Sequence, residues 1–412
     1  MFLYNLVIYL YGLVIKLASI NKLKAKQWVT GRKNWRENLC KKIAMLNSGN
    51  VLWVHCASYG EFEQGRPLIE AIKKEHPGYK IVLSFFSPSG YEAFKDWRGA
   101  DLICYLPLDT KKNARDFISI VKPKASIFIK YEFWLNFLFE LKKHNIPTYL
   151  VSAVFKPHHP FFRWYGGIFR RSLNTFNKLF IQDEASGKLL EKIDIKNYEV
   201  CGDTRFDRVI EVKENFKEIE QLKDFKGNKK LIIAGSTWAK DEELVLKTFL
   251  QLKDKKIKLV IVPHDIDEKY VNETVHKVKT AGLTFSLFTD KINNDDEVLI
   301  VNVMGLLSKI YFYADCSYIG GGFNSGLHNS LEPAVYGKPV TFYGKDYVKF
   351  NEAVDLINMG AAKVVEDETD LLKTFNLFLS DTFDHHQLTN KLQAYFKTNS
   401  NTTNKVLPSI KF

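Results

Sequence analysis

Cysteine is scarce in this sequence of 412 residues, and none of its five cysteines belongs to a C-x-x-C pair. They stand singly at Cys40, Cys56, Cys104, Cys201 and Cys316. An odd number of isolated cysteines argues against a disulfide framework and against a zinc site. We therefore expect reduced thiols on apolar strands, in a reducing compartment. The sequence also lacks internal repeats and low-complexity segments.

Acidic residues are outnumbered by basic ones, 47 to 59, which gives a formal net charge of +12. An excess of this size suggests an anionic partner, either nucleic acid, an acidic lipid or a phosphorylated substrate, but a lysine-rich composition alone would also produce it. The basic residues are not gathered in one arm and no nucleic-acid motif is present, so we expect no nucleic-acid partner. A non-enzymatic basic protein that binds acidic lipid or nucleic acid stays open as an alternative.

Charge is nearly absent from the first residues. Phe2 to Leu17 is almost wholly apolar and is interrupted by Asn5, Gly12 and Lys16. About 20 apolar residues are needed to span a bilayer, so residues 1–22 are a borderline single anchor. A helix lying in the membrane interface and an ordinary core helix are the other interpretations. No basic residue precedes the run and no small-residue cleavage site follows it, so no signal peptide is expected.

Basic residues follow this run, namely Lys22, Lys24, Lys26, Arg32, Lys33 and Arg36. Basic residues beside a membrane segment favour the cytoplasmic side. We expect the body of the protein on the cytoplasmic side of a membrane.

From about Asn50 onward, short apolar runs alternate with helical stretches, which predicts parallel sheets covered by helices on both faces. The alternation pauses in a charged stretch rich in Lys and Glu. We predict an α/β protein with two doubly wound domains at residues 23–211 and 231–380, a linker at 212–230, and a C-terminal helix and tail at 381–412 that frays from Thr398. Ligands are expected at the carboxyl ends of the strands.

The longest chemical motif runs from Tyr318 to Ala334. A strand enters three glycines, and a helix start follows at His328-Asn329-Ser330, with Glu332 in its first turn. Glycines let backbone approach a ligand closely, and the N–H groups of a helix start attract an anion. A carboxylate there can accept hydrogen bonds from a ribose. The pattern predicts a nucleotide site.

Three shorter motifs also follow predicted strands. Trp53 to Glu61 delivers a carboxylate ahead of a helix, either as a general base or as a helix cap. Ile129 to Asn136 places Glu132 among aromatic residues, either as a desolvated carboxylate or as part of a surface loop. Ile233 to Trp238 carries Gly-Ser-Thr, which suits a phosphate or a simple helix cap, and it lacks the spacing of a Walker loop.

A basic and aromatic loop occupies residues 156–171, with His158 and His159 side by side and Arg163 after them. It could hold an anionic lipid or a sugar phosphate. No carboxylate or histidine cluster accompanies the two histidines, so no metal site is expected.

Taken together, the ordered motifs resemble the Kdo transferases of Gram-negative bacteria, which attach 3-deoxy-D-manno-octulosonic acid (Kdo) to the lipid A precursor. Besides the N-terminal apolar run and the 321–334 run, the matching segments are Gly31-Arg32, His55–Glu61, Tyr131–Asn136 (with Leu135 in place of a proline), Gly202–Asp207 and Gly235–Thr237.

The resemblance implies a GT-B fold, in which two Rossmann-like doubly wound domains face each other across a cleft, together with an N-terminal hydrophobic helix. It implies transfer of Kdo from CMP-Kdo to the lipid A precursor (lipid IVA) by direct displacement with inversion, without cofactor or metal. Glu61 corresponds to the general base. The positions that match the donor site are Gly235, Ser236, Thr237, Gly321, Gly322, Asn329 and Glu332.

Arg32, Glu132 and Arg163 are candidates for binding acceptor phosphates or the Kdo carboxylate. One position departs from the family: where many members read Pro-Arg-His, this chain reads Pro263-His264-Asp265, so the expected donor-binding arginine is missing and His264 is its only candidate substitute. A UDP-sugar glycosyltransferase or epimerase shares the glycine loop with its glutamate and stays open as an alternative.

Overall fold

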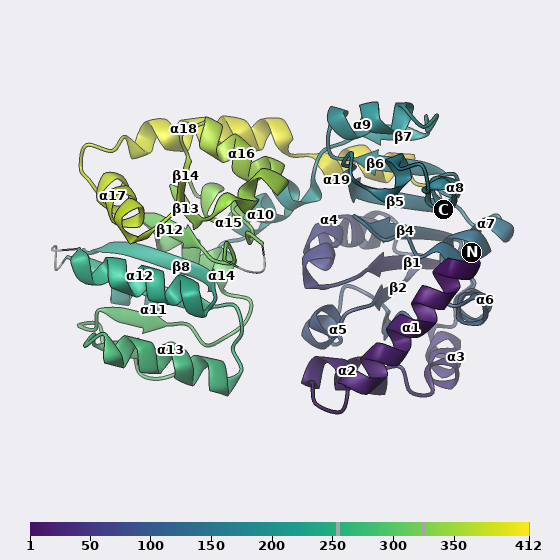
Figure 1. Ribbon diagram of the computed structural model, residues 1–412, viewed down its shortest axis with the longest axis horizontal. Helices are drawn as coiled ribbons and strands as arrows, with labels where there is room; N and C mark the ends of the chain where they lie inside the picture. Colours follow the sequence, from purple (N-terminus) through teal and green to yellow (C-terminus); the bar gives the residue numbers. More distant parts are fainter. Residues whose placement is uncertain (253–255, 324–325, 412) are drawn as a thin grey trace. The chain divides into compact units, whose positions relative to one another are not determined.

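The computed structural model describes residues 1–252, 256–323 and 326–411, and the chain separates into two compact units (Figure 1). The first unit combines Met1–Arg208 with Asn399–Phe412, and the second is Val209–Thr398. Each unit is built on its own parallel sheet, as the alternation of apolar runs and helices predicts.

The first sheet has the strand order β3-β2-β1-β4-β5-β6-β7, and all its pairings are parallel. Its strands are β1 (Val51–Cys56), β2 (Lys80–Phe85), β3 (Leu102–Tyr105), β4 (Ala125–Ile129), β5 (Thr148–Ala153), β6 (Lys178–Ile181) and β7 (Tyr198–Val200). In β1 every side chain is buried, because Trp53 faces one hydrophobic core and Val54 the other. A continuous apolar run is what a strand covered on both faces requires.

Helices cover both faces of this sheet. They are α1 (Phe2–Ala18), α2 (Leu23–Thr30), α3 (Trp35–Leu46), α4 (Tyr59–Glu75), α5 (Pro88–Phe94), α6 (Lys111–Val121), α7 (Leu135–Lys143), α8 (Gly167–Leu173), α9 (Glu184–Glu191), α10 (Thr204–Glu214) and α19 (Thr402–Val406), with short 3-10 turns at η1 (Pro160–Phe162) and η4 (Leu407–Ser409). Residues of α6, α7, α8 and α9 fill one core, and residues of α4 and of the C-terminal segment fill the other.

The second sheet has the order β10-β11-β9-β8-β12-β13-β14, again with parallel pairings. Its strands are β8 (Lys230–Thr237), β9 (Ile257–Pro263), β10 (Phe285–Leu287), β11 (Val298–Ile300), β12 (Cys316–Ile319), β13 (Val340–Tyr343) and β14 (Ala362–Val365). The helices of this unit are α11 (Glu220–Lys226), α12 (Ala239–Gln251), α13 (Glu268–Thr280), α14 (Leu307–Ile310), α15 (Leu331–Ala334), α16 (Asn351–Asn358), α17 (Glu368–Phe378) and α18 (His385–Asn399), with 3-10 turns at η2 (Tyr311–Tyr313) and η3 (Lys345–Lys349).

Helix α1 is docked on the first unit by polar contacts along one of its edges. The Tyr4 hydroxyl donates to the buried carboxylate of Asp109 and accepts the Leu135 N–H, and the Asn136 amide donates to Asn5 Oδ1 at 3.0 Å. Asp109 also accepts the N–H groups of the first turn of α7. The start of α1 is thereby joined to the start of α7.

Most of α1 faces outward nevertheless. Its exposed apolar and aromatic side chains are Phe2, Leu3, Leu6, Val7, Tyr9, Leu10, Tyr11, Leu13, Val14 and Leu17. Within the described residues, no helix taken singly is long and apolar enough to cross a membrane. Helices α1 and α2 pass that test only as a pair, with a bend of 119° between them.

Two predictions about the domain limits differ from the structure. The predicted linker at 212–230 contains the end of α10 and all of α11, whose Leu222 and Phe225 are fully buried in the second unit. The tail predicted to fray from Thr398 forms α19 and η4, and its Val406, Leu407 and Ile410 join a core of the first unit. In both segments the buried apolar residues are few and stand among polar ones, so the sequence shows no pattern from which their packing could be predicted.

Candidate active site

The strand order reverses between β1 and β4 in the first sheet, and between β8 and β12 in the second. Ligands of doubly wound proteins bind at the carboxyl ends of the strands at such a reversal. The motifs that contain Glu61 and Glu132 follow β1 and β4, and the Gly-Ser-Thr and triple-glycine motifs end or follow β8 and β12. Each predicted motif therefore lies where the topology of its own unit places a ligand.

Glu61 lies in the first turn of α4, directly after β1. Its side chain is half-buried, and the hydroxyl of Ser58, the residue that precedes the helix, donates to its Oε2. Hydrogen bonding of this kind holds the carboxylate in one orientation, while half-burial keeps it within reach of a substrate.

A buried polar network lies at the ends of β1 and β4. His55 Nδ1 lies 3.0 Å from the Ser84 carbonyl oxygen and 2.9 Å from the Ser84 hydroxyl oxygen. His55 Nε2 lies 3.1 Å from Glu132 Oε2, and Trp134 Nε1 donates to the same Oε2 at 2.5 Å. Glu132 is 8% exposed. The desolvated-carboxylate interpretation of Glu132 fits these contacts, and the surface-loop interpretation does not.

Glu61 and Glu132 both lie near the thiol of Cys56. Burial raises the pKa of Cys56 well above its ordinary value, and the negative charges of Glu61 and Glu132 raise it further. The last residue of β1 is therefore inert as a nucleophile, and its surroundings contain two carboxylates at the end of one strand.

Arg32, a candidate for binding acceptor phosphate or the Kdo carboxylate, makes its observed contacts within the protein. It is 9% exposed, and its guanidinium donates to the carbonyl oxygens of Leu106, Trp28 and Phe86 at 2.8, 3.0 and 2.7 Å. The guanidinium carbon also lies 3.9 Å from the centre of the Trp28 ring. Burial lowers the pKa of Arg32 to about 9. Arg32 joins α2 to the ends of β2 and β3.

The basic and aromatic loop at 156–171 displays its side chains on a fixed backbone. Arg170 Nη1 donates to the carbonyl oxygens of Phe161 and Arg163, at 3.0 and 2.9 Å. Arg163 is exposed, and Trp164 beside it is 92% exposed. The side chain of Arg163 is thus presented to the surroundings, and its role in acceptor binding stays a prediction.

In the second unit, the Gly-Ser-Thr turn ends β8 with a bulge. Ser236 has a left-handed backbone (φ 52°), and the first residue of α12 follows Trp238, not Ser236 or Thr237. The Thr237 hydroxyl is fully buried and donates to Glu242 Oε1 at 3.3 Å. In contrast to the prediction, this hydroxyl belongs to the core, which leaves Ser236 as the half-buried hydroxyl of the turn.

The triple glycine is required by the packing of the loops themselves. Gly321 has a φ of 99°, and a Cβ at Gly320 would lie 2.3 Å from the Ser236 carbonyl oxygen. The carboxylate of Asp241 is completely buried and accepts the N–H groups of Gly321 and Trp238 at 3.0 and 2.9 Å. One carboxylate therefore holds the glycine loop against the start of α12.

Glu332 lies in the first turn of α15, as predicted, although this helix has only four residues. The side chain of Asn329 donates to Glu332 Oε1 at 3.2 Å and accepts the Leu331 N–H. The motif also contains Asn324 and Ser325, which lie outside the described residues. Gly321, Gly322, Asn329 and Glu332 thus belong to one loop system, and their contacts with a donor stay predictions.

Three aromatic rings meet beside this loop. The ring centres of Trp238 and His264 are 4.5 Å apart, as are those of His264 and His328. Trp238 Nε1 donates to His328 Nε2 at 3.4 Å. His264, the candidate substitute for a missing arginine, is exposed, and its ring contacts both of the other two rings.

Comparison with known proteins agrees with these motifs. Residues 33–208 match the family model described as 3-deoxy-D-manno-octulosonic-acid transferase (Kdo transferase). The 3-deoxy-D-manno-octulosonic acid transferase of Aquifex aeolicus is 30% identical over 345 residues, which cover 82% of this chain and 89% of that protein. The enzyme of the same name from Haemophilus influenzae is 27% identical over 335 residues, 77% of each chain.

The chain belongs to the Kdo transferase family.

Solved structures with a similar fold include UDP-GlcNAc 2-epimerases. The enzyme from Neisseria meningitidis has a TM-score of 0.59 at 15% identity and covers 85% of this chain and all of its own. The enzyme from Methanocaldococcus jannaschii has a TM-score of 0.56 at 14% identity, covering 84% of this chain and 99% of its own. At such identities the likeness concerns the fold alone, the GT-B arrangement of two Rossmann-like domains in one chain.

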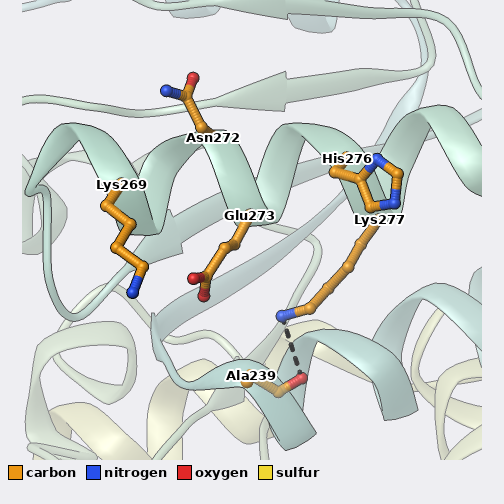
Figure 2. A pocket seen from close by; sticks show the side chains of 6 residues that line it. All are labelled: Ala239, Lys269, Asn272, Glu273, His276 and Lys277. Carbon is orange, nitrogen blue, oxygen red and sulfur yellow. Dashed lines mark hydrogen bonds between the residues drawn. The ribbon is translucent and has the colours of Figure 1, made fainter.

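A pocket lies between α13 and the start of α12 (Figure 2). Its lining residues are Ala239, Lys269, Asn272, Glu273, His276 and Lys277. Lys277 Nζ donates to the Ala239 carbonyl oxygen at 3.4 Å and lies 2.6 Å from Glu242 Oε2. Across the described residues, no group of three His, Cys, Asp or Glu side chains is placed to hold a metal ion.

Sequence reasoning missed residues that act by positioning other residues. In the sequence, His55 is only the first residue of a motif. Its contact with Glu132 joins the ends of two strands that are far apart in the sequence. The roles of Asp241 and His328 could not be predicted either, because their contacts join residues of different elements, namely the end of β8, α12 and the glycine loop. Only the family spacing of His55 and Glu61 could have drawn attention to His55.

Proposed function

We propose that this protein transfers Kdo from CMP-Kdo to a hydroxyl group of a lipid A precursor at a membrane surface. Membership of the Kdo transferase family supports the reaction class. The observation that carries the residue assignment is the place of Glu61, half-buried and oriented by Ser58 at the carboxyl end of β1, beside the strand reversal.

In the proposed step, the acceptor hydroxyl oxygen attacks the anomeric carbon of Kdo while the bond from that carbon to the CMP phosphate oxygen breaks. Glu61 takes the hydroxyl proton, and CMP leaves as an anion. A single displacement of this kind inverts the anomeric centre, and it needs one base in the correct position. Because the His55 and Trp134 contacts hold Glu132 inward, we assign Glu132 to the positioning of the β4 loop.

The donor nucleotide is assigned to the loops of the second unit. Gly235, Ser236, Gly321 and Gly322 present backbone to the phosphate, Asn329 reinforces the orientation of Glu332, and Glu332 accepts from the ribose hydroxyls. Hydrogen-bond donors fixed in advance stabilise the charge that develops on the leaving group. The buried carboxylate of Asp241 supplies this fixation by holding Gly321.

The general base is tested by Glu61→Gln, with Glu70→Gln on the same helix as the matched control. Glutamine keeps the size of the side chain but cannot take up the proton, so turnover should fall by about two orders of magnitude or more. CMP affinity and melting temperature should stay close to those of the wild type. The readout is the mass of the lipid product formed from CMP-Kdo made in situ. Wild-type turnover in the Glu61 variant would refute the assignment.

A UDP-sugar enzyme is the second candidate, and the epimerase-like fold is the observation in its favour. Calorimetric titrations with CMP and with UDP separate the two candidates. We expect CMP to bind more tightly, and a preference for UDP would exclude Kdo transfer.

We further propose that α1 lies along the surface of the inner membrane on its cytoplasmic side. The outward-facing apolar side chains of α1, together with exposed Lys16, Lys22, Lys24 and Lys26, are typical of an interfacial helix. The contacts of Tyr4 and Asn5 hold the opposite edge of the helix on the protein. This placement favours the interfacial interpretation over a free spanning anchor.

Vesicle sedimentation tests this placement, with vesicles of phosphatidylethanolamine and phosphatidylglycerol. The double variant Leu3→Glu/Leu10→Glu should lose most of its binding, since both side chains are exposed and apolar. Leu377→Glu, an exposed leucine of the second unit, is the control. Equal binding of both variants would mean that α1 does not contact the membrane.

A further inference from the structure

The ring cluster of Trp238, His264 and His328 draws its members from three places in the second unit. Trp238 follows β8, His264 follows β9, and His328 lies in the loop after β12. The planes of the two imidazoles are inclined by only 23°, and those of Trp238 and His264 by 31°. His264 is thus packed face to face against His328 and lies close over the indole of Trp238.

Backbone bonds attach this cluster to the proposed donor loops. The His264 N–H donates to the Thr237 carbonyl oxygen at 2.9 Å, and the His328 N–H donates to that of Gly320 at 3.3 Å. A Cβ at Gly321 would lie 2.8 Å from His328 Cδ2, so the ring rests directly on the glycine loop. The imidazoles therefore flank the backbone to which we assign the donor phosphate.

The hydrogen bond from Trp238 decides the charge of His328. An indole N–H can only donate, so His328 Nε2 must be an unprotonated acceptor and this imidazole is neutral. Burial and, to a smaller extent, the neighbouring His264 together lower the pKa of His328 to about 4, in agreement with that geometry. A proton that enters the cluster is accordingly directed to the exposed ring of His264.

Charged and titratable groups surround the ring cluster on several elements. The charged and titratable groups on the elements that carry or contact the rings are Lys240, Asp241 and Glu242 on α12, Tyr318 on β12, Glu332 on α15, and Asp265, Asp267, Glu268, Lys269, Tyr270 and Glu273 around the start of α13. Of these, Asp241 is committed to the N–H groups of Gly321 and Trp238 and to the Tyr318 hydroxyl.

We propose that His264 is the inducible cation of the donor site: when the nucleotide phosphate binds at the glycine loop, His264 takes up a proton from solvent, and the imidazolium is held between Trp238 and His328. This inference rests on the proposed function, which places the nucleotide there. A nearby anion favours the charged form of an imidazole, and an aromatic face stabilises the cation. An arginine at this position would instead be charged permanently.

The test is calorimetric titration of CMP at about pH 6 and about pH 8, each in two buffers with different enthalpies of ionisation. The difference between the binding enthalpies observed in the two buffers gives the number of protons taken up on binding. Because the phosphate of CMP itself titrates near pH 6, every result is compared between variants and wild type. The variants are His264→Gln and His264→Arg, and His276→Gln, an exposed histidine on α13, is the control (Figure 2).

We expect His264→Gln to bind CMP about tenfold more weakly than wild type at the lower pH and to match it at the higher pH, since a pKa shift of one unit corresponds to tenfold. This variant should take up fewer protons than wild type. His264→Arg should bind well at both pH values and also take up fewer protons. His276→Gln should match wild type throughout.

Equal CMP affinity and equal proton uptake in wild type and His264→Gln at both pH values would overturn the inference and leave the proposed function intact. If wild type prefers UDP, the proposed function fails, and the same comparison made with UDP still decides the role of His264. Melting curves of each variant confirm that the proteins compared are folded.

Discussion

At the scale of single residues, Asp241 has the most consequential contacts in the second unit. It is completely buried, and it accepts the N–H groups of Trp238 and Gly321 and the hydroxyl of Tyr318. Burial raises the pKa of Asp241, and the three hydrogen bonds oppose that rise. A buried carboxylate with three donors fixes the positions of all three, so the glycine loop is set before a donor arrives.

We expect Asp241→Ala to weaken CMP binding at least about tenfold and to lower the free energy of unfolding by at least about 2 kcal/mol, because three buried donors lose their acceptor. Asp241→Asn should retain most of both, since its oxygen can accept the two N–H groups while its amide donates to the Tyr318 oxygen. Calorimetry and urea unfolding measure the two quantities. An alanine variant with reduced stability but wild-type affinity would show that the carboxylate supports only the fold.

The sequence predicts the place of a single functional residue only where that residue belongs to a recognisable motif. Glu61 and Glu332 are found in the first helical turns where their motifs predict them. The side chains of Thr237 and Arg32, both predicted to bind ligands, make hydrogen bonds within the protein, because residue type and spacing do not tell whether a side chain turns inward.

At the scale of elements, α1 is the segment in which local sequence and tertiary packing disagree most. Its composition is that of a membrane helix, yet Tyr4 and Asn5 make polar contacts with Asp109 and Asn136. Burial raises the pKa of Asp109 to about 6, and the Tyr4 hydroxyl and the N–H groups of α7 act against that rise. The apolar run could be predicted from the sequence, but the partners of Tyr4 and Asn5 could not, because they lie more than a hundred residues away in the chain.

We expect Tyr4→Phe to lower the free energy of unfolding by about 1–3 kcal/mol near pH 7.5, by removing a donor from a buried carboxylate. Because the pKa of native Asp109 is raised, its ionisation costs stability as pH rises from about 4 through about 6, and the lost hydrogen bond matters most above that range. The loss should therefore be smaller near pH 5. Urea unfolding at both pH values measures it.

The control for this helix is Tyr9→Phe, since Tyr9 is on the same helix but is exposed. Equal effects of the two substitutions at both pH values would mean that the contact between Tyr4 and Asp109 contributes nothing specific.

At the scale of the whole molecule, the chain passes between its two units twice, within α10 and at the end of α18. Asp207 connects these two places inside the first unit. It accepts the N–H groups of Asn401, Thr402 and Thr403 and the Thr403 hydroxyl. The last residue of the Gly202–Asp207 motif thus has a definite task, which is to cap α19 and hold the returning segment.

Asp207→Ala should lower the unfolding free energy of the first unit by about 1–3 kcal/mol, because the cap of α19 is lost. The second unit should keep its own transition. Asp346→Ala, which removes an exposed partner of Lys349, is the control and should change little. Hydrogen exchange followed for each unit separately measures the effect. An equal loss of protection in both units would argue against a local cap.

The two sheets could be predicted from the alternation of apolar runs and helices, but the return of the chain could not. The apolar part of the contact between this sheet and the C-terminal segment comes from three side chains, Val406, Leu407 and Ile410, which are too few to form a periodic pattern. Cores that join distant parts of a chain leave little local trace in sequence.

Because residues 399–412 complete the first unit, the second unit is in effect an insertion within it. During synthesis, β1 to β7 are made before the second unit, yet residues 399–412, which complete their core, follow the second unit in the chain. A protein without residues 399–412 would have a complete second unit and a first unit with part of its hydrophobic core uncovered, a form that proteases and chaperones recognise.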